Sequence, residues 1–215
     1  MNLFILRADG SQLREITEHI EDGLPAWSPD GNSLAFSSTR HGDKQSRIYV
    51  IDEVPFARGK ADGRPLNFGP DDVRGEYPAW TDDGRIVYSG CDVTVEPAPC
   101  GLFVMSAAAG VHPFEQLTDR KEDAAPDVSG DTVVFMSQRD GTWEIYVVDL
   151  DGTGLRQLTD NAANDGLPIW SPDGRSIAFV SDEGGAWAVW VMNADGSGRR
   201  RLFPIGGNGL AFDWQ

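Results

Sequence analysis

The sequence predicts an all-β protein in which similar units repeat around an axis. One phrase returns along the chain, at residues 24–31, 77–84, 125–131, 167–174 and, truncated, 212–214. Its anchor positions 27, 80, 128, 170 and 214 are 53, 48, 42 and 44 residues apart. Strand-like runs separate the copies, and no helical period exceeds a turn or two. Periods in the forties with several short strands each are typical of the blades of a β-propeller.

Each unit opens with the anchor phrase, which we expect to form its first strand. In residues 28–31 and 171–174 the sequence Ser-Pro-Asp-Gly follows the anchor. Proline suits the second position of a tight turn and glycine accepts a positive φ, so this sequence links two antiparallel strands. Apolar runs then predict the second strands at residues 34–36, 86–88, 133–135 and 177–179.

The third and fourth strands of each unit are joined by a second tight turn. The third strand is predicted at residues 3–6, 48–51, 102–105, 145–148 and 189–192. Asp-Gly turns follow at 151–152 and 195–196, and Asp-Gly between strand-like runs indicates a hairpin. The fourth strands end at Thr17, Thr118, Thr159 and Phe203. A complete unit therefore holds four antiparallel strands.

The chain begins inside one unit, at its third strand, and ends inside another, at its first. We expect residues 210–215 to pair beside the strands of residues 2–17, because pairing the N- and C-terminal strands removes two exposed sheet edges. This predicts a single β-propeller domain over residues 1–215, a monomer with five blades of mostly four antiparallel strands. The alternative is an incomplete six-bladed propeller, which would need roughly 40 more residues to close.

The charge composition indicates which classes of partner are not expected. Lys and Arg number 18 against 34 Asp and Glu, which gives a net charge of −16. Nucleic acids and anionic membranes are bound by neutralising phosphates with cations, so neither is an expected partner. No stretch has the length of a transmembrane helix, and no membrane insertion is expected. No signal peptide precedes the first strand, which leaves a trimmed leader open.

Two cysteines indicate the compartment. Cys91 follows the strand of residues 86–90, and Cys100 precedes that of residues 102–105. These strands are predicted neighbours in a hairpin, so a disulfide would clamp the loop 92–99 at its base. It would place the protein in the periplasm or outside the cell. Two reduced thiols in a cytoplasmic protein, or a metal pair lacking partners, remain the alternatives.

An acidic side chain precedes the anchor in most units. Asp22, Asp123 and Asp165 stand five residues before it, and Glu76 stands four before. The first strand of a propeller blade is innermost, so these carboxylates are expected to converge at one mouth of the central channel. At roughly 8 Å and an effective dielectric near 20, each pair repels by about 2 kcal/mol.

A cation or a basic partner group would offset this repulsion. Oxygen ligands favour a hard ion, so Asp22, Asp123 and Asp165 are predicted Ca²⁺ ligands, and with Glu76 they form a predicted binding surface. The alternative is that each aspartate merely caps the turn into its strand.

The sequence offers no set of catalytic residues. The three histidines, His19, His41 and His112, fall in different predicted loops without metal-ligand spacing. The Gly-x-Ser-x-Gly elbow of hydrolases and the phosphate-cradling motifs are absent. The protein is therefore predicted not to be an enzyme.

The tryptophans form two groups. Trp27, Trp80, Trp170 and Trp214 recur at one position and are expected in the core between blades. Trp143 and Trp187 both open a third strand. They are predicted either to form an exposed aromatic patch for a partner or a sugar, or to pack at a sheet edge.

The repeat also carries a family resemblance. Its pattern is Pro-x-Trp-Ser-Pro-Asp-Gly-x-x-Ile-Ala-Phe, followed by Ile-Tyr-Val-Met-x-Ala-Asp-Gly-x-x-x-Arg-x-Leu-Thr. This resembles the WD-type repeat of TolB-like β-propellers over essentially the whole chain, without the separate N-terminal domain of TolB. It also resembles the repeats of propellers appended to serine peptidases and to polysaccharide-degrading enzymes.

The resemblance to TolB implies a non-enzymatic protein-binding scaffold. Its partner would be a cell-envelope protein, bound with or without a cation at the acidic mouth of the channel. The alternative function is a carbohydrate-active or carbohydrate-binding propeller, which would be a polysaccharide lyase, a glycosidase or a lectin. In a lectin, Trp143 and Trp187 would be the stacking platforms.

Overall fold

The computed structural model describes residues 2–40, 42–54, 60, 63–66, 73–110 and 113–206. These residues form strands, turns and loops, and none of them belongs to a helix that could span a membrane. The strands make four four-stranded antiparallel sheets and one two-stranded sheet. The prediction of an all-β chain of repeated units is confirmed.

The strand bounds follow the chain, sheet by sheet. The hairpin consists of β1 (Phe4–Ile5) and β2 (Arg14–Glu15). The first sheet consists of β3 (Asp22–Trp27), β4 (Leu34–Ser38), β5 (Arg47–Ile51) and β6 (Arg64–Pro65). The second consists of β7 (Val73–Trp80), β8 (Arg85–Asp92), β9 (Cys100–Ser106) and β10 (Phe114–Gln116). The third consists of β11 (Ala124–Ser129), β12 (Thr132–Ser137), β13 (Glu144–Asp149) and β14 (Arg156–Gln157). The fourth consists of β15 (Asp165–Trp170), β16 (Ser176–Ser181), β17 (Ala188–Asn193) and β18 (Arg200–Pro204).

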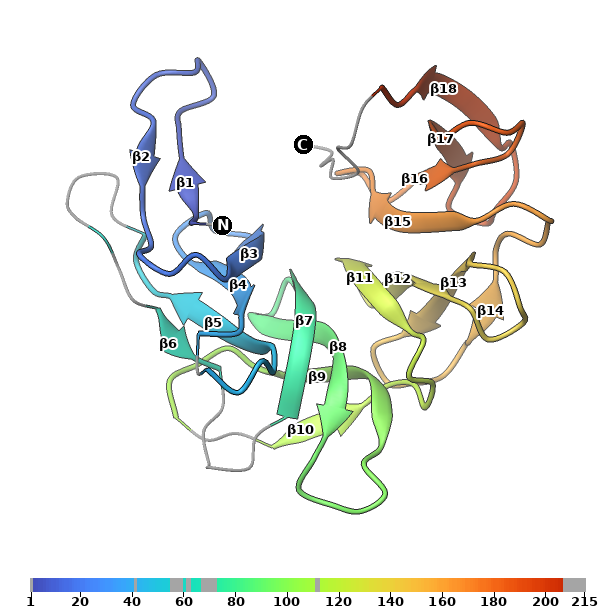
Figure 1. Cartoon of the computed structure of the whole chain (residues 1–215). Helices are drawn as coiled ribbons and strands as arrows, with labels where there is room; N and C mark the ends of the chain where they lie inside the picture. The colour runs from blue at the N-terminus through green and yellow to red at the C-terminus, as the bar shows by residue number, and fades with distance from the viewer. Residues whose placement is uncertain are drawn as a thin grey trace.

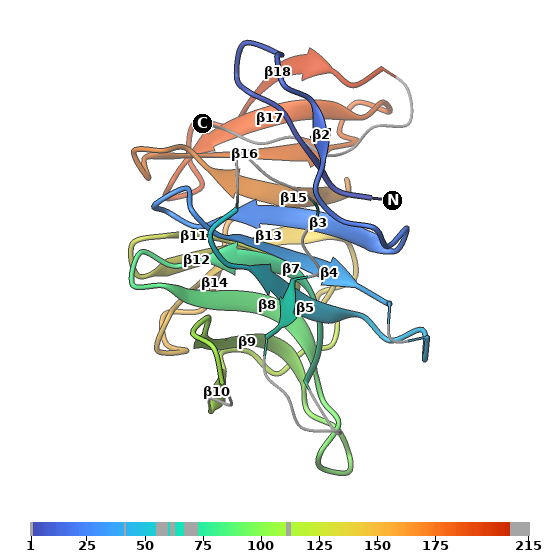
Figure 2. The ribbon, with the colours of Figure 1, turned by 90° about the vertical axis from the view of Figure 1, so that its left-hand side faces the viewer.

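The sheets follow one another around an arc, with the β1–β2 hairpin at one end and the fourth sheet at the other (Figure 1). Their first strands, β3, β7, β11 and β15, lie on the inner side of the arc, and consecutive first strands contact each other. Figure 2 shows the sheets from the side, with the β8–β9 loop projecting beyond the second sheet. Each four-stranded sheet is one blade of a propeller.

The predicted number of five blades is wrong. The described residues form four complete blades, and the hairpin β1–β2 contains only two strands. These two correspond to the third and fourth strands of a unit, so the composite fifth blade depended on residues 210–215. That segment lies outside the described residues, and so does Trp214. The incomplete six-bladed propeller and the single domain over residues 1–215 stay predictions.

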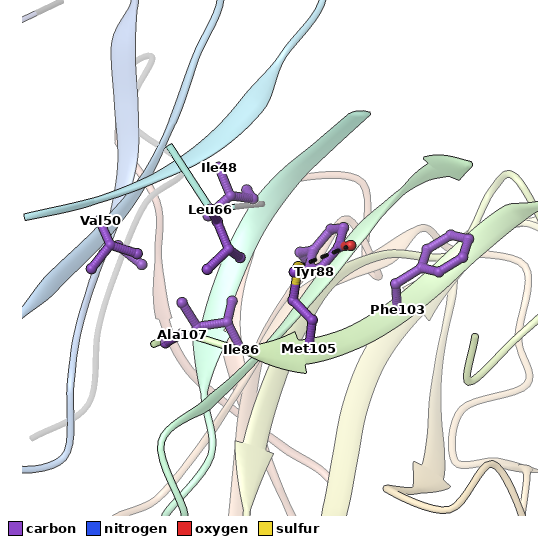
Figure 3. Packing of buried hydrophobic residues seen from close by; sticks show 9 residues of the cluster. Ile48, Val50, Leu66, Ile86, Tyr88, Phe103, Met105 and Ala107 are labelled. Atoms are coloured by element: carbon purple, nitrogen blue, oxygen red, sulfur yellow. Dashed lines mark hydrogen bonds between the residues drawn. The ribbon is translucent and has the colours of Figure 1, made fainter. Parts of the chain in front are cut away.

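Hydrophobic side chains between neighbouring sheets hold the arc together. One cluster joins Val50 and Ile48 of the first sheet to Ile86, Tyr88 and Phe103 of the second (Figure 3). Similar clusters join the hairpin to the first sheet, the second sheet to the third, and the third to the fourth. Each fully buried large side chain contributes roughly 1.5–3 kcal/mol, so these clusters fix the spacing of the sheets.

Three of the repeated tryptophans belong to these clusters, as predicted. Trp27 packs on the cluster between the hairpin and the first sheet, and Trp80 packs on the cluster between the first and second sheets. Trp170 belongs to the cluster between the third and fourth sheets. In addition, Nε1 of Trp80 donates a hydrogen bond of 3.0 Å to the carbonyl oxygen of Ala26 in the preceding sheet. The tryptophan position therefore links one blade to the next.

The first strand of every sheet contains a bulge at a residue before proline. These residues adopt the left-handed conformation, and they are Leu24 (φ 52°), Tyr77 (φ 55°), Ala125 (φ 49°) and Leu167 (φ 49°). The register of each first strand shifts at this point. A left-handed residue other than glycine is uncommon and costs of order 1–2 kcal/mol. The repeated Xaa-Pro pair thus bends all four inner strands in the same way.

Candidate binding site at the loop end of the sheets

Antiparallel pairing brings the start of each first strand to one end of its sheet. Asp22 of β3 pairs with Ser38 at the end of β4, which pairs with Arg47 at the start of β5. The fourth sheet has the same arrangement, since Asp165 pairs with Ser181. We call this the loop end, and it carries the connections 17–21, 42–46, 93–99, 118–123, 138–143, 159–164 and 182–187. The predicted residues Asp22, Glu76, Asp123, Asp165, Trp143 and Trp187 all lie at it or next to it.

Asp22 is completely buried and is neutralised within its own sheet. Its two carboxylate oxygens accept hydrogen bonds from Nε and Nη2 of Arg40, at 3.2 and 2.7 Å. The guanidinium lies over the rings of Phe36 and Tyr49, at 5.1 and 4.5 Å from their centroids. A planar guanidinium that binds a carboxylate with two hydrogen bonds and stacks on aromatic faces uses the chemistry specific to arginine.

The third sheet repeats this arrangement. Nη2 of Arg139 lies 2.7 Å from both carboxylate oxygens of buried Asp123. The guanidinium of Arg139 lies over Phe135 and Tyr146, at 5.6 and 4.9 Å. In the first and third sheets, therefore, the leading aspartate already has a cation.

The second sheet has no leading aspartate. Gly75 pairs with Gly90, as Asp22 pairs with Ser38, so Gly75 and not Glu76 holds the equivalent position. A Cβ atom on Gly75 would lie 2.4 Å from Cδ2 of Tyr88, which leaves no room for a carboxylate. Glu76 is exposed and belongs one residue further along the strand. The offset follows from the spacing, since Glu76 stands four residues before its anchor and the aspartates stand five before theirs.

In the second sheet a disulfide closes the loop end. Cys91 and Cys100 face each other in the register of β8 and β9 and are bonded. The amide of Asp92 donates a hydrogen bond of 2.9 Å to the carbonyl of Pro99, which closes the same loop from inside. The predicted clamp on residues 92–99 is confirmed.

The fourth sheet holds its aspartate differently. Asp165 is completely buried, and its Oδ2 accepts hydrogen bonds from Nδ2 of Asn161 at 2.7 Å and Nη1 of Arg199 at 3.4 Å. Its Oδ1 is also buried but has no hydrogen-bond partner in the described part of the chain. Glu183 stands where the other two sheets carry arginine, and it pairs with Arg199 at 3.0 Å.

The arginines at this end were missed by the sequence analysis, although a local signal marks them. The second strands of the first and third sheets end in Ser-x-Arg, at residues 38–40 and 137–139. The fourth sheet has Ser-Asp-Glu at residues 181–183 instead. Because the arginine is 16 to 18 residues from its aspartate, the pair is visible only once strand register is known.

The two predicted aromatic residues are unequal. Trp187 is 38% exposed, whereas Trp143 is half-buried. The carbonyl oxygen of Trp143 accepts a hydrogen bond of 2.7 Å from the amide of Asp165, so this residue also closes the fourth sheet against the third. Of the two, only Trp187 is exposed.

The predicted metal ligands are not grouped in the described structure. Among the residues that it describes, no three histidine, cysteine or acidic side chains lie together as a metal site would require. Arg40 and Arg139 also remove the charge repulsion that made a cation necessary at Asp22 and Asp123. Binding of Ca²⁺ by these residues stays a prediction.

A hollow lies along the β1–β2 hairpin. It has a volume of about 350 Å³ and is lined by Ile5, Leu6, Arg7, Gln12, Leu13 and Arg14. None of the predicted site residues lines this cavity, so it is not part of the candidate binding site at the loop end.

Comparison with known proteins adds a family and several relatives. The family described as TolB beta propeller domain matches residues 77–211. An uncharacterized protein of Agrobacterium fabrum is 27% identical over 187 residues, which are 80% of this chain and 59% of that protein. The uncharacterized peptidase YuxL of Bacillus subtilis is 27% identical over 70% of this chain and 20% of its own length. Dipeptidyl-peptidase 5 of Porphyromonas gingivalis is 38% identical over 35% of this chain and 13% of its own length. The chain thus spans less than two thirds of each of these relatives.

Solved structures show the same fold. Putative TolB from Agrobacterium tumefaciens superposes with a TM-score of 0.72 at 24% identity, covering 92% of this chain and 72% of that one. TolB from Acinetobacter baumannii superposes with a TM-score of 0.74 at 21% identity, covering 94% and 49%. At these identities the likeness concerns the fold alone.

The prediction that the protein is not an enzyme is overturned. Two of the relatives are named as peptidases. The prediction rested on missing catalytic motifs in 215 residues, whereas the matched stretches are only 20% and 13% of those peptidases. Motifs missing from so short a stretch do not exclude enzymatic activity.

Proposed function

Since the chain belongs to the TolB β-propeller domain family, we propose that it is a propeller module that binds a protein at its loop end. One observation carries this proposal: the two ends of the sheets differ in how uniform they are. At the opposite end, which carries the turns between first and second strands, three of the four sheets are alike: the hydroxyls of Ser28, Thr81 and Ser171 each donate a hydrogen bond to an aspartate two residues later. At the loop end, the sheets carry arginine pairs, a disulfide or a partly paired acid. Variable loops on a rigid scaffold are where binding specificity resides.

Charge favours a basic partner surface. The net charge is −16, and Glu76 is exposed at the loop end of the second sheet. Complementary potentials speed up association and select partners more than they add affinity. By the family resemblance, the partner that we expect is a cell-envelope protein. In a longer protein with a catalytic domain, the same surface would hold the substrate polypeptide.

The disulfide supports an exported protein. Disulfides persist in the periplasm and outside the cell but are rare in the cytosol. We therefore place the module, and its partner, in the periplasm or the extracellular space.

The carbohydrate alternative has less support. Sugar binding by paired platforms needs two accessible rings, and Trp143 is half-buried. This function stays a prediction without a specific observation in its favour.

Charge reversal at the two ends of one sheet tests the proposal. Glu76→Lys changes the loop end of the second sheet, and Asp82→Lys changes an exposed acid in the opposite turn. A partner from the cell envelope is identified with wild-type protein, purified and titrated against both variants by calorimetry. We expect Glu76→Lys to weaken binding at least tenfold while Asp82→Lys changes it less than twofold. Equal effects of both variants would reject the loop end as the binding surface.

A further inference from the structure

We propose that the loop end of the fourth sheet is a receptor for a guanidinium group, such as an arginine side chain of the bound protein. This inference rests on the proposed function, because it names the group that the partner presents. The first and third sheets show which group this position accepts. There, one aspartate and a pair of aromatic rings together hold one arginine.

The fourth sheet keeps the aspartate and the aromatic pair but lacks the arginine. Phe179 and Trp190 are register partners, as Phe36 and Tyr49 are in the first sheet. Glu183 replaces the arginine of the second-strand end. The two aromatic residues and the carboxylate are thus retained, whereas an acid replaces the arginine that follows the second strand.

Arg199 replaces the missing arginine only in part. It comes from the residue before β18, and its guanidinium lies 5.7 Å from the ring centroid of Trp190. Its contact with Asp165 measures 3.4 Å, against 2.7 Å for the arginines of the other two sheets. Its other terminal nitrogen is directed to Glu183. Oδ1 of Asp165 and Nε1 of Trp190 are both buried without hydrogen-bond partners in the described chain.

The negative charge at the loop end of the fourth sheet is also not fully compensated. In the first and third sheets one carboxylate meets one guanidinium, so the charges cancel. In the fourth sheet Asp165 and Glu183 meet Arg199 alone, which leaves one negative charge uncompensated. A second guanidinium would supply that charge, hydrogen bonds for Oδ1 and a flat face for Trp190. An ammonium group would supply only the charge, because it lacks the planar fork.

The loop beside Asp165 offers a route of entry. Arg40 and Arg139 tie the corresponding loops of the first and third sheets directly to their aspartates. The loop 182–187 is held instead by hydrogen bonds from Asn164 to Asp182 at 2.8 and 2.9 Å, and by the ion pair of Glu183 with Arg199. Its tip is Gly184 and Gly185, and a Cβ atom on either would meet nothing within 4 Å. The side chains of Arg199 and Glu183 are 27% and 39% exposed, and Trp187 of the same loop as Glu183 is also exposed. A ligand can therefore displace Arg199 from Asp165 without disturbing the core.

The test uses three peptides, acetyl-Gly-Arg-Gly-amide and its lysine and citrulline counterparts. Binding is followed by calorimetry and by the NMR signal of the Trp190 indole N–H. We expect the arginine peptide to bind, the lysine peptide to bind at least tenfold more weakly, and the uncharged citrulline peptide not to bind. Arg199→Ala should strengthen binding of the arginine peptide severalfold, because it removes the internal competitor.

Variants at the repeat position provide the controls. Asp165→Asn should abolish binding, whereas Asp123→Asn, at the same position of the third sheet, should leave it unchanged. Glu183→Arg installs the arginine of the other sheets, so it should abolish binding without lowering the melting temperature. This second variant keeps the test decisive if Asp165→Asn does not fold.

The inference is overturned if neither wild type nor Arg199→Ala binds the arginine peptide, or if binding survives both Asp165→Asn and Glu183→Arg. Partner binding that still depends on Glu76 would then leave the proposed function standing. If the arginine peptide does not bind and partner binding does not depend on Glu76, both the guanidinium site and the proposed function are rejected.

Discussion

Two arginines determine how the leading aspartates of the first and third sheets are stabilised. The side chains of Asp22 and Asp123 have no exposed surface, and those of Arg40 and Arg139 are nearly buried. Removing one partner of such a pair leaves an uncompensated buried charge, which costs about 3–5 kcal/mol. The aromatic rings beneath the guanidinium hold its plane in position. These pairs therefore stabilise the fold.

At the opposite end, hydrogen bonds in three turns make stability depend on pH. Hydroxyl groups of Ser28 and Ser171 lower the pKa of Asp30 and Asp173 below the usual aspartate value. Arg85, and after it Thr81, lower the pKa of Asp83. A carboxyl group with a lowered folded-state pKa stabilises the fold above its unfolded pKa and loses that contribution as pH falls.

We expect the free energy of unfolding to decrease as the pH falls below about 4, where unfolded aspartates take up protons. Replacing all three turn aspartates by asparagine, as Asp30→Asn, Asp83→Asn and Asp173→Asn together, should make this decrease shallower because asparagine does not titrate. Urea unfolding of wild type and triple variant over a series of pH values measures both slopes. Identical slopes would show that the turns do not contribute.

At the scale of the element, the inner strands combine a strained residue with proline. Ala125 is buried and left-handed, whereas Ala79 is buried at a regular position of β7. Glycine in a strand costs roughly 0.5–1 kcal/mol relative to alanine, but it also relieves a left-handed position.

The two alanines therefore predict opposite responses to the same substitution. Ala79→Gly should lower the free energy of unfolding by about 1 kcal/mol, whereas Ala125→Gly should leave it unchanged or raise it. Chemical denaturation of the two variants measures the difference. A larger loss at Ala125 than at Ala79 would contradict the assigned role of the bulge.

The disulfide is the second element-scale device. Cys91 and Cys100 enclose a short loop in an otherwise regular hairpin. Loop-closure entropy for a loop of this length amounts to about 2–3 kcal/mol. The double variant Cys91→Ser/Cys100→Ser should lose that much stability in urea, and wild-type protein in reducing buffer should show the same loss. Equal stability of the oxidised and reduced protein would show that the disulfide does not stabilise the fold.

Features of single repeats could be predicted from sequence, whereas features that join distant positions could not. The Ser-Pro-Asp-Gly turns, the strand order and the Cys91–Cys100 pair depend on neighbouring residues, and all were predicted. The partners of Asp22 and Asp123 lie on another strand and became visible only with the register. The composite fifth blade joined the two ends of the chain, and its segment 210–215 lies outside the described residues.

At the scale of the whole molecule, the arc of sheets places the four loop ends in a row, and because their residues differ, this face of the molecule is asymmetric. The four-stranded sheets share their hydrophobic contacts and their bulges, and three of them share the tryptophan, so their loop ends are held in a common frame (Figure 1). Within that frame the first and third ends are neutralised by internal arginines, and the second is covalently closed. The fourth keeps a buried carboxylate oxygen that has no hydrogen-bond partner among the described residues. We therefore assign binding to the loop end of the fourth sheet, where the charge of the carboxylates is only partly compensated.

The most direct measurement of this claim compares the unfolding free energies of three equivalent variants, Asp22→Asn, Asp123→Asn and Asp165→Asn. The first two should each lose about 3 kcal/mol or more, because a buried arginine loses its counter-charge. Asp165→Asn should lose less than about 1 kcal/mol, since its charge is only partly compensated in the free protein. An equal loss in all three would show that Asp165 is as fully committed to the fold as the others, and would contradict the account.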